Sequence, residues 1–150
     1  MSRVQLALNV SDLDSAVEFY SKLFNTRPAK LRPGYANFAV ADPPLKLVLI
    51  EGETGGSLNH LGVEVETTDL VQSAQRRLDA EGLATATEDG VACCYAVQDK
   101  VWVDDPDGAP WEIYTVLADV EMPAGQLRVT NPQDATCCSS DPESAARCCD

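Results

Sequence analysis

The sequence predicts an α+β fold in which two βαβββ modules lie side by side and form one curved mixed sheet around an open cup. Two short alternating stretches, which begin at Gln5 and at His60, resemble each other. Each stretch is followed by an amphipathic helical pattern, and each helical pattern by three strand candidates. We therefore expect a first module at residues 1–56 and a second module at residues 57–120.

The first module begins with an alternating strand at residues 5–10. Its apolar side chains suit the core, whereas Gln5, Ala7 and Asn9 share the opposite face, which would line the cup. Residues 11–14 (Ser-Asp-Leu-Asp) are typical of a capping box at a helix start, and apolar residues then recur at helical spacing up to Phe24. Strands are expected at residues 28–32, 35–41 and 45–51.

The second module repeats this order. His60, Gly62 and Glu64 would face the cup from its first strand. Thr68 or Asp69 is the expected N-cap of the helix, and Gly82 is the expected stop. Strands follow at residues 84–88, 97–104 and 110–117, with a strong turn at Asp105-Pro106-Asp107-Gly108.

Composition changes after the second module. Residues 121–150 are rich in cysteine, acidic residues and small polar residues, and they predict a flexible tail with room for a short strand at 126–130. The net charge of −13 argues against nucleic acid or an anionic membrane as partner. The chain has no apolar run long enough for a transmembrane helix and no signal-peptide pattern, so we expect a cytoplasmic protein with reduced thiols.

All six cysteines occur as adjacent pairs, here called doublets: Cys93-Cys94, Cys137-Cys138 and Cys148-Cys149. Neighbouring residues are poorly placed for a disulfide, and zinc sites favour wider spacings. Two adjacent thiols instead suit one soft centre with two exchangeable positions, such as trivalent arsenic. We therefore predict that Cys93 and Cys94 capture a metalloid or soft metal. The alternative is that the doublets are accidental, and the two tail doublets would either collect such ligands or be dispensable.

Glu112 follows the strong turn on the last strand. If its side chain faces the cup, Gln5, His60 and Glu112 converge, and His60 is the only histidine of the chain. An imidazole, a carboxylate and an amide oxygen would form a mononuclear site similar to the facial triad of non-haem Fe(II) oxygenases. The alternative is a buried structural histidine, an edge-strand glutamine and a surface acid.

Two further residues near the first doublet are candidates for catalysis. Tyr95 and Lys100 would orient the substrate or stabilise a reduced-oxygen species, and otherwise they are a packing aromatic and a solvated lysine. Trp102 and Trp111 are expected in the core.

The repeated βαβββ pattern and the run from Asp105 to Glu112 resemble the vicinal oxygen chelate superfamily over residues 3–117. This superfamily includes glyoxalase I, extradiol dioxygenases and bleomycin-resistance proteins. Within it, residues 6–13, residues 19–24 and the doublet before Tyr95 are similar to the ArsI-type carbon–arsenic lyases.

The resemblance implies an Fe(II)-dependent dioxygenase that uses O2 to cleave trivalent organoarsenicals to arsenite, with formaldehyde as the second product when the organic group is methyl. It implies Gln5, His60 and Glu112 as metal ligands and Cys93 and Cys94 as the arsenic-binding thiols. Many members carry histidine at the position of Gln5, so the glutamine of this sequence departs from the family pattern. The expected partner is a small-molecule organoarsenical, bound by a monomer or a homodimer.

Two other functions remain open for the same fold. The first is a binding or resistance protein that sequesters a drug or metalloid without catalysis, and stoichiometric Fe(II) binding would argue against it. The second is a glyoxalase-like lyase or isomerase, which needs no O2. Oxygen consumption separates the latter from a dioxygenase.

Overall fold

The computed structural model describes residues 1–93 and 95–120, and it has the predicted order of elements, βαβββ twice. The first module comprises β1 (Arg3–Val10), α1 (Leu13–Leu23), β2 (Lys30–Arg32), β3 (Tyr35–Val40) and β4 (Leu45–Glu51). The second comprises β5 (Ser57–Glu64), α2 (Thr68–Ala80), β6 (Ala86–Cys93), β7 (Ala96–Asp104) and β8 (Pro110–Asp119). The predicted α+β fold class is therefore confirmed.

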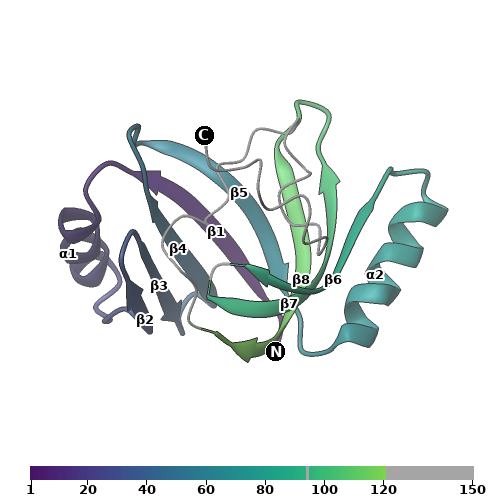
Figure 1. Cartoon of the computed structure of the whole chain (residues 1–150), viewed down its shortest axis with the longest axis horizontal. Coiled ribbons are helices and arrows are strands. Elements are labelled where there is room, and N and C mark those ends of the chain that lie inside the picture. Colours follow the sequence, from purple (N-terminus) through teal and green to yellow (C-terminus); the bar gives the residue numbers. More distant parts are fainter. Residues whose placement is uncertain (94, 121–150) are drawn as a thin grey trace, which may run out of the picture.

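Within these described residues the eight strands form one mixed sheet in the order β2-β3-β4-β1-β5-β8-β7-β6. β1 and β5 pair antiparallel at the centre, where the two modules meet. Each of them also pairs in parallel with a strand of its own module, β1 with β4 and β5 with β8. The sheet curves between α1 and α2, which lie at opposite sides of the molecule (Figure 1). The hollow of this curve is the predicted cup.

Both helices begin at a side-chain cap. In α1, Oδ1 of Asp12 accepts a hydrogen bond from the amide of Ser15 at 2.7 Å, so the helix starts within the predicted run of residues 11–14 but its N-cap is Asp12. α2 is capped by Thr67 and not by Thr68 or Asp69 as expected, because Oγ1 of Thr67 accepts from the amide of Leu70. The hydroxyl of Thr68 donates to Asp99 instead. α2 ends where predicted, just before Gly82 at φ +81°.

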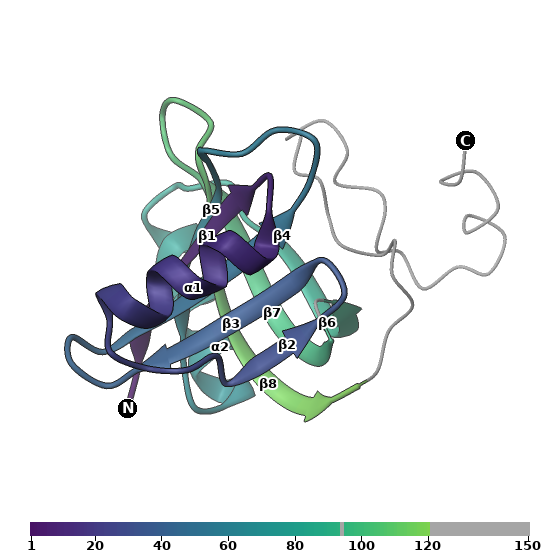
Figure 2. The same ribbon diagram turned by 90° about the vertical axis from the view of Figure 1, so that its left-hand side faces the viewer.

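The core of the first module lies between α1 and the outer face of the sheet. The apolar side of α1 packs on β3 and β4 (Figure 2). The buried residues of this core are Leu13, Ala36, Phe38, Val40, Leu47 and Leu49. Burial of these side chains holds the sheet in place and leaves the inner face free for polar residues.

β6 is longer than the sequence predicted. A register shift between Glu88 and Val91 forms a β-bulge, in which Gly90 takes φ +62° and donates its amide to Oδ1 of Asp99 at 2.7 Å. The strand therefore continues past residue 88 to Cys93. As a result Cys93 is the last residue of β6 and pairs with Ala96 of β7, and it does not lie in an extended loop over residues 89–97 as expected.

The strong turn before β8 is confirmed. Oδ1 of Asp105 accepts from the amides of Asp107 and Ala109, both at 2.9 Å, and Gly108 adopts φ +82°. The turn sets where β8 begins, so that Glu112 pairs with Gly62 of β5. No helix among the described residues is long and apolar enough to cross a membrane. The predicted flexible tail, its short strand and both tail doublets lie outside the described residues.

Candidate metal centre

The three predicted metal ligands come together on the inner face of the sheet. Gln5 lies on β1, His60 on β5 and Glu112 on β8, which are neighbouring strands, and all three side chains are buried. Nε2 of Gln5 lies 3.0 Å from Nε2 of His60 and 2.6 Å from Oε1 of Glu112. Nε2 of His60 lies 3.3 Å from the same Oε1. Strands that are far apart in the sequence thus present three polar atoms to one point.

Gly62 makes room for this convergence. It pairs with Gln5 on one side and with Glu112 on the other, so it stands between the two side chains. A Cβ atom at Gly62 would lie 3.0 Å from Cγ of Glu112 and 3.5 Å from Cβ of Gln5. The sequence placed Gly62 on the cup face, but its function as a spacer became visible only in the structure.

A chain of side-chain amides orients His60. Asn9 donates to Oγ of Ser57 at 2.9 Å, and Nδ2 of Asn59 donates to Oδ1 of Asn9 at 2.8 Å. Oδ1 of Asn59 therefore faces Nδ1 of His60, at 2.7 Å, and Nδ1 must be the nitrogen that carries the proton. Nε2 then presents its lone pair to Gln5 and Glu112, as a metal-ligating histidine does.

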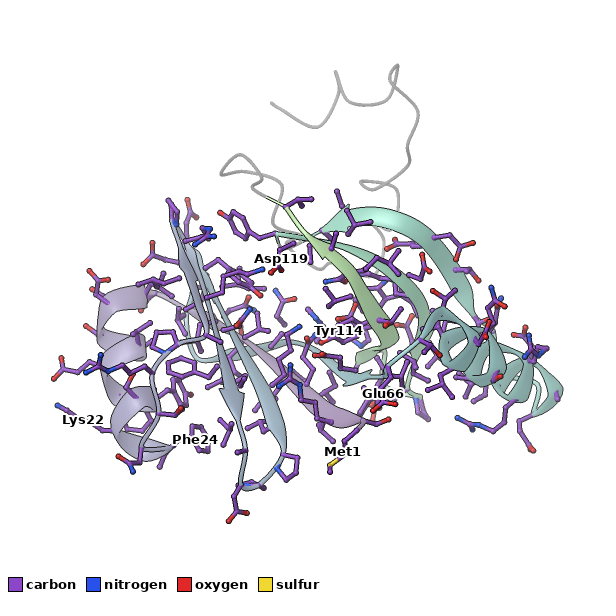
Figure 3. All side chains as sticks on the ribbon, turned by 90° about the horizontal axis from the view of Figure 1, so that it is seen from below. Met1, Lys22, Phe24, Glu66, Tyr114 and Asp119 are labelled. Carbon is purple, nitrogen blue, oxygen red and sulfur yellow. The ribbon has the colours of Figure 1, made fainter. Side chains whose placement is uncertain are left out.

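A second chain of contacts reaches Gln5. The hydroxyl of Tyr114, which lies in the middle of the molecule (Figure 3), donates to Oε1 of Gln5 and is 3.0 Å from Oε2 of Glu64. Glu64 is in turn paired with Arg3 at 3.1 Å and with Lys46 at 3.3 Å. Burial raises the pKa of Tyr114 far above its usual range, and the nearby carboxylates raise it further, so the hydroxyl stays protonated.

Glu112 is held as a carboxylate by Lys100. Burial alone would raise the pKa of Glu112, but the positive charge of the Lys100 ammonium and its hydrogen bond to the carboxylate outweigh burial, and the pKa of Glu112 lies well below its usual range. Nζ of Lys100 stands 2.9 Å from Oε2 of Glu112 and 5.2 Å from the ring centroid of Trp102. Trp102 also packs edge-on against His60, with ring centroids 5.5 Å apart.

One pocket contains the ligand set and the first cysteine of the doublet. Cys93 is buried at the end of β6, whereas Cys94 lies outside the described residues. Trp102, which was expected in the core, lines this pocket, and so does Lys100, the predicted catalytic lysine. Residues from both modules form the lining: Gln5, Tyr35, Lys46, Val48, Ile50, Asn59, His60, Cys93, Gln98, Lys100, Trp102 and Glu112.

Tyr95 joins the β6–β7 connection to the first module. Its ring lies 5.3 Å from that of Tyr35, and its hydroxyl donates to the carbonyl of Pro33 at 3.2 Å. Nζ of Lys30 donates to the carbonyl of Tyr95 at 3.2 Å and also pairs with Asp119. These contacts hold the end of β6, and with it Cys93, against the rim of the cup. A catalytic function for Tyr95 stays a prediction.

The arrangement fits a divalent cation that takes mixed ligands. Among the described residues, no group of three or more His, Cys, Asp or Glu side chains is placed to hold a metal ion, so Gln5 would have to complete the His60–Glu112 pair. The three atoms lie 2.6 to 3.3 Å apart, as do neighbouring ligands on one face of an octahedron with bonds of about 2.1 Å. Gln5 would ligate through Oε1, which a turn of the amide brings to the position of Nε2.

The sequence predictions gave no function to the residues that orient the proposed ligands, although they placed Glu64 on the cup face. Asn59 contacts Nδ1 of His60, and Tyr114 donates to Gln5. Glu64 contacts the hydroxyl of Tyr114. The strand alternation contains a signal for two of them. Tyr114 follows Glu112 by two positions on β8, and Glu64 follows Gly62 by two on β5, so both share the cup face.

The fold and this site define a cup built from two βαβββ modules, with a candidate metal centre on its inner face. Residues 3–113 match the Glyoxalase/Bleomycin resistance protein/Dioxygenase superfamily, and the chain belongs to it. The fold is also that of the Mn(II)-bound glyoxalase from Novosphingobium aromaticivorans, with a TM-score of 0.58 and 17% identity over 83% of this chain and 44% of that chain.

Two curated relatives cover nearly the whole chain. It is 58% identical to the trivalent organoarsenical cleaving enzyme of Thermomonospora curvata, over 93% of this chain and 89% of the relative. It is 56% identical to the cadmium-induced protein CadI of Mycobacterium tuberculosis, over 100% of this chain and 94% of the relative. The predicted resemblance to the organoarsenical-cleaving branch of the superfamily is therefore confirmed.

Proposed function

We propose that this protein is a non-haem Fe(II)-dependent dioxygenase that cleaves the carbon–arsenic bond of trivalent organoarsenicals and releases arsenite. One observation carries the proposal: the cluster of Gln5, His60 and Glu112 lines the same pocket as Cys93, the first cysteine of the doublet. The high identity to an organoarsenical cleaving enzyme supports the same substrate class.

The doublet would hold the substrate by arsenic. A trivalent organoarsenical has two exchangeable groups besides its organic group, so two thiolates can bind it and leave the carbon–arsenic bond intact. Cys93 is buried in the pocket, and Tyr95 fixes the adjoining backbone to the first module. An arsenic atom bound by Cys93 and Cys94 would therefore present its organic group toward the inner face of the sheet.

Gln5, His60 and Glu112 would hold Fe(II), and the bound Fe(II) would activate O2. The overall reaction needs no other oxidant or reductant. One methylarsonous acid and one O2 contain the same atoms as one formaldehyde and one arsenous acid, with arsenic trivalent throughout and the four electrons passing from carbon to oxygen. Lys100 pairs with Glu112 and keeps it ionised, and the ring of Trp102 packs against both His60 and the Lys100 ammonium.

Two other functions are retained as alternatives. Similarity to a cadmium-induced protein favours a sequestering protein, which would use the thiols for a soft metal or metalloid and turn nothing over. Membership of the glyoxalase superfamily also allows a lyase or isomerase that works without O2.

The deciding experiment loads the protein with Fe(II) under argon, adds trivalent methylarsenite, and follows arsenite, formaldehyde and O2 in air and under argon. A dioxygenase should consume one O2 for each arsenite and each formaldehyde, in air only. His60→Ala should lose iron and turnover together. Equal product under argon would support the lyase class, and tight binding without product would support sequestration.

A further inference from the structure

The side-chain amide of Gln5 is hydrogen-bonded at both ends. It is a donor at one end and an acceptor at the other. The amide group meets His60 and Glu112 at one end and Tyr114 at the other. At the first end, Nε2 of His60 and Oε1 of Glu112 are both acceptors, 3.3 Å apart. An NH2 group satisfies both of them, since it has two N–H donors. This explains why Nε2 of Gln5 faces them.

A cation placed among these three residues reverses that requirement. It needs a lone pair from each ligand, and an amide offers one only through its oxygen. The amide must then turn over, so that Oε1 faces His60 and Glu112 while Nε2 faces Tyr114. In that orientation Tyr114 has to accept a hydrogen bond from Gln5, and its own proton needs another acceptor.

Glu64 is placed to be that acceptor. Its Oε2 lies 3.0 Å from the Tyr114 hydroxyl, and Arg3 and Lys46 keep the carboxylate paired on its other sides. Tyr114 has a single proton, although both Oε1 of Gln5 and Oε2 of Glu64 lie within its reach. The proton can therefore go to either side, and each choice fixes one orientation of the amide.

We propose that Tyr114 and Glu64 are positioning residues which select the end of the Gln5 amide that faces His60 and Glu112. When a divalent cation binds, the amide turns over, and the Tyr114 hydroxyl changes from donor toward Gln5 to donor toward Glu64. The inference rests on the proposed metal site, and it adds a reason why a glutamine can serve where an imidazole would need no such selection.

The first test compares two substitutions of Glu64 that remove the same charge. Glu64→Leu removes the acceptor, so the Tyr114 proton is left with Oε1 of Gln5 and holds the amide in the orientation that cannot ligate. Glu64→Gln keeps an acceptor, because the donors of Arg3 and Lys46 draw its carbonyl oxygen to the position shared with Tyr114. Anaerobic Fe(II) titration should give the Leu variant an affinity about 10-fold to 100-fold lower than the Gln variant.

A Gln5→Glu background supplies the control. A carboxylate has two equivalent oxygens, so one can ligate while the other accepts from Tyr114, whichever residue stands at position 64. Glu64→Leu and Glu64→Gln should then bind Fe(II) equally, and thermal unfolding of each variant checks that it is folded. An equal difference between the two substitutions in both backgrounds would overturn the inference.

A direct readout does not depend on these variants. In the full chain with diamagnetic Zn(II), the side-chain NH2 protons of Gln5 should show nuclear Overhauser contacts to the Tyr114 ring, and after chelator treatment to the His60 ring. Contacts to His60 under both conditions would contradict the proposal. If the wild-type protein binds neither ion, or if His60→Ala binds as well as wild type, the proposed metal function itself fails, which is a different outcome.

Discussion

Lys100 and Glu112 form a buried ion pair at the centre of the cup. Nζ lies 2.9 Å from Oε2, and the two residues are only 2% and 3% exposed. Charges enclosed in this way compensate each other only while both are present. The pair crosses from β7 to β8, so it joins the strand that follows the doublet to the strand that carries a proposed metal ligand.

Lys100→Met should destabilise the protein strongly, because it leaves the Glu112 carboxylate buried without its cation. The expected loss in the free energy of unfolding is about 3–5 kcal/mol, measured by urea denaturation in the presence of a chelator. The double variant Lys100→Met, Glu112→Gln has no unpaired charge and should recover most of the loss. A single variant as stable as wild type would show that the pair does not stabilise the fold.

Gly62→Ala should weaken metal binding without unfolding the protein. The new methyl group would lie 3.0 Å from Cγ of Glu112 and push that side chain away from Gln5 and His60. We expect the affinity for Fe(II) to fall by up to about 10-fold, measured by anaerobic titration. Gly52→Ala is the matched control, since a Cβ there meets nothing within 4 Å. Equal affinity in the two variants would argue against Gly62 as a spacer.

Cys93→Ser and Cys94→Ser should each separate capture from metal binding. Serine keeps the size of the side chain but removes a soft thiolate, and the proposed metal ligands lie on other strands. Both variants should therefore bind Fe(II) normally and neither bind nor cleave a trivalent organoarsenical, with arsenite release as the readout.

Truncation before Cys137 is the companion to these variants. It should leave a folded and active enzyme, because the ligand set and Cys93 lie within residues 5–112. Cleavage retained in both serine variants, or lost only on truncation, would move the capture site away from the first doublet.

Gln98→Leu should stabilise the protein. Oε1 of Gln98 is buried in the described part of the chain and has no hydrogen-bond partner there, and such an acceptor costs about 1–3 kcal/mol. An apolar side chain of similar volume removes that cost, so the free energy of unfolding should rise by about 1 kcal/mol. Gln72→Leu, on the exposed side of α2, should give no such gain. A Gln98→Leu protein less stable than wild type would contradict this account.

Glu64→Gln should flatten the loss of stability in acid. Burial raises the pKa of Glu64, but the positive charges of Lys46 and Arg3 lower it by more than burial raises it. The pKa of Glu64 in the folded protein therefore lies below its usual value. A carboxyl group of this kind stabilises the fold above its unfolded pKa of about 4.3, and the contribution disappears as the pH falls. Thermal unfolding of the variant should therefore change less than that of wild type between about pH 5 and pH 3. Parallel curves would contradict this.

Local patterns were sufficient for most of the elements. The alternation of residues 5–10 and 60–65, the helix start within residues 11–14 and the turn at Asp105 are each short-range signals, and each was found where expected. The end of β6 was not predicted correctly, because Asp89 and Gly90 form a bulge that depends on Asp99 of the partner strand. A contact between strands cannot be seen in the local sequence of either one.

By itself, the sequence determined the order of elements in two modules, the cup-side positions of Gln5 and His60, and the pairing of every cysteine with a neighbour, because side-chain alternation and residue spacing are local properties of the chain. For Glu112 it left two faces open, and the structure decided for the cup. Only the tertiary structure decided that three central strands bring the proposed ligand atoms to about 3 Å from one another, that Gly62 leaves the room for them, and that Tyr114 and Glu64 lie at the far end of the Gln5 amide. These relationships depend on the register between strands from opposite modules, and register is set by long-range pairing and burial.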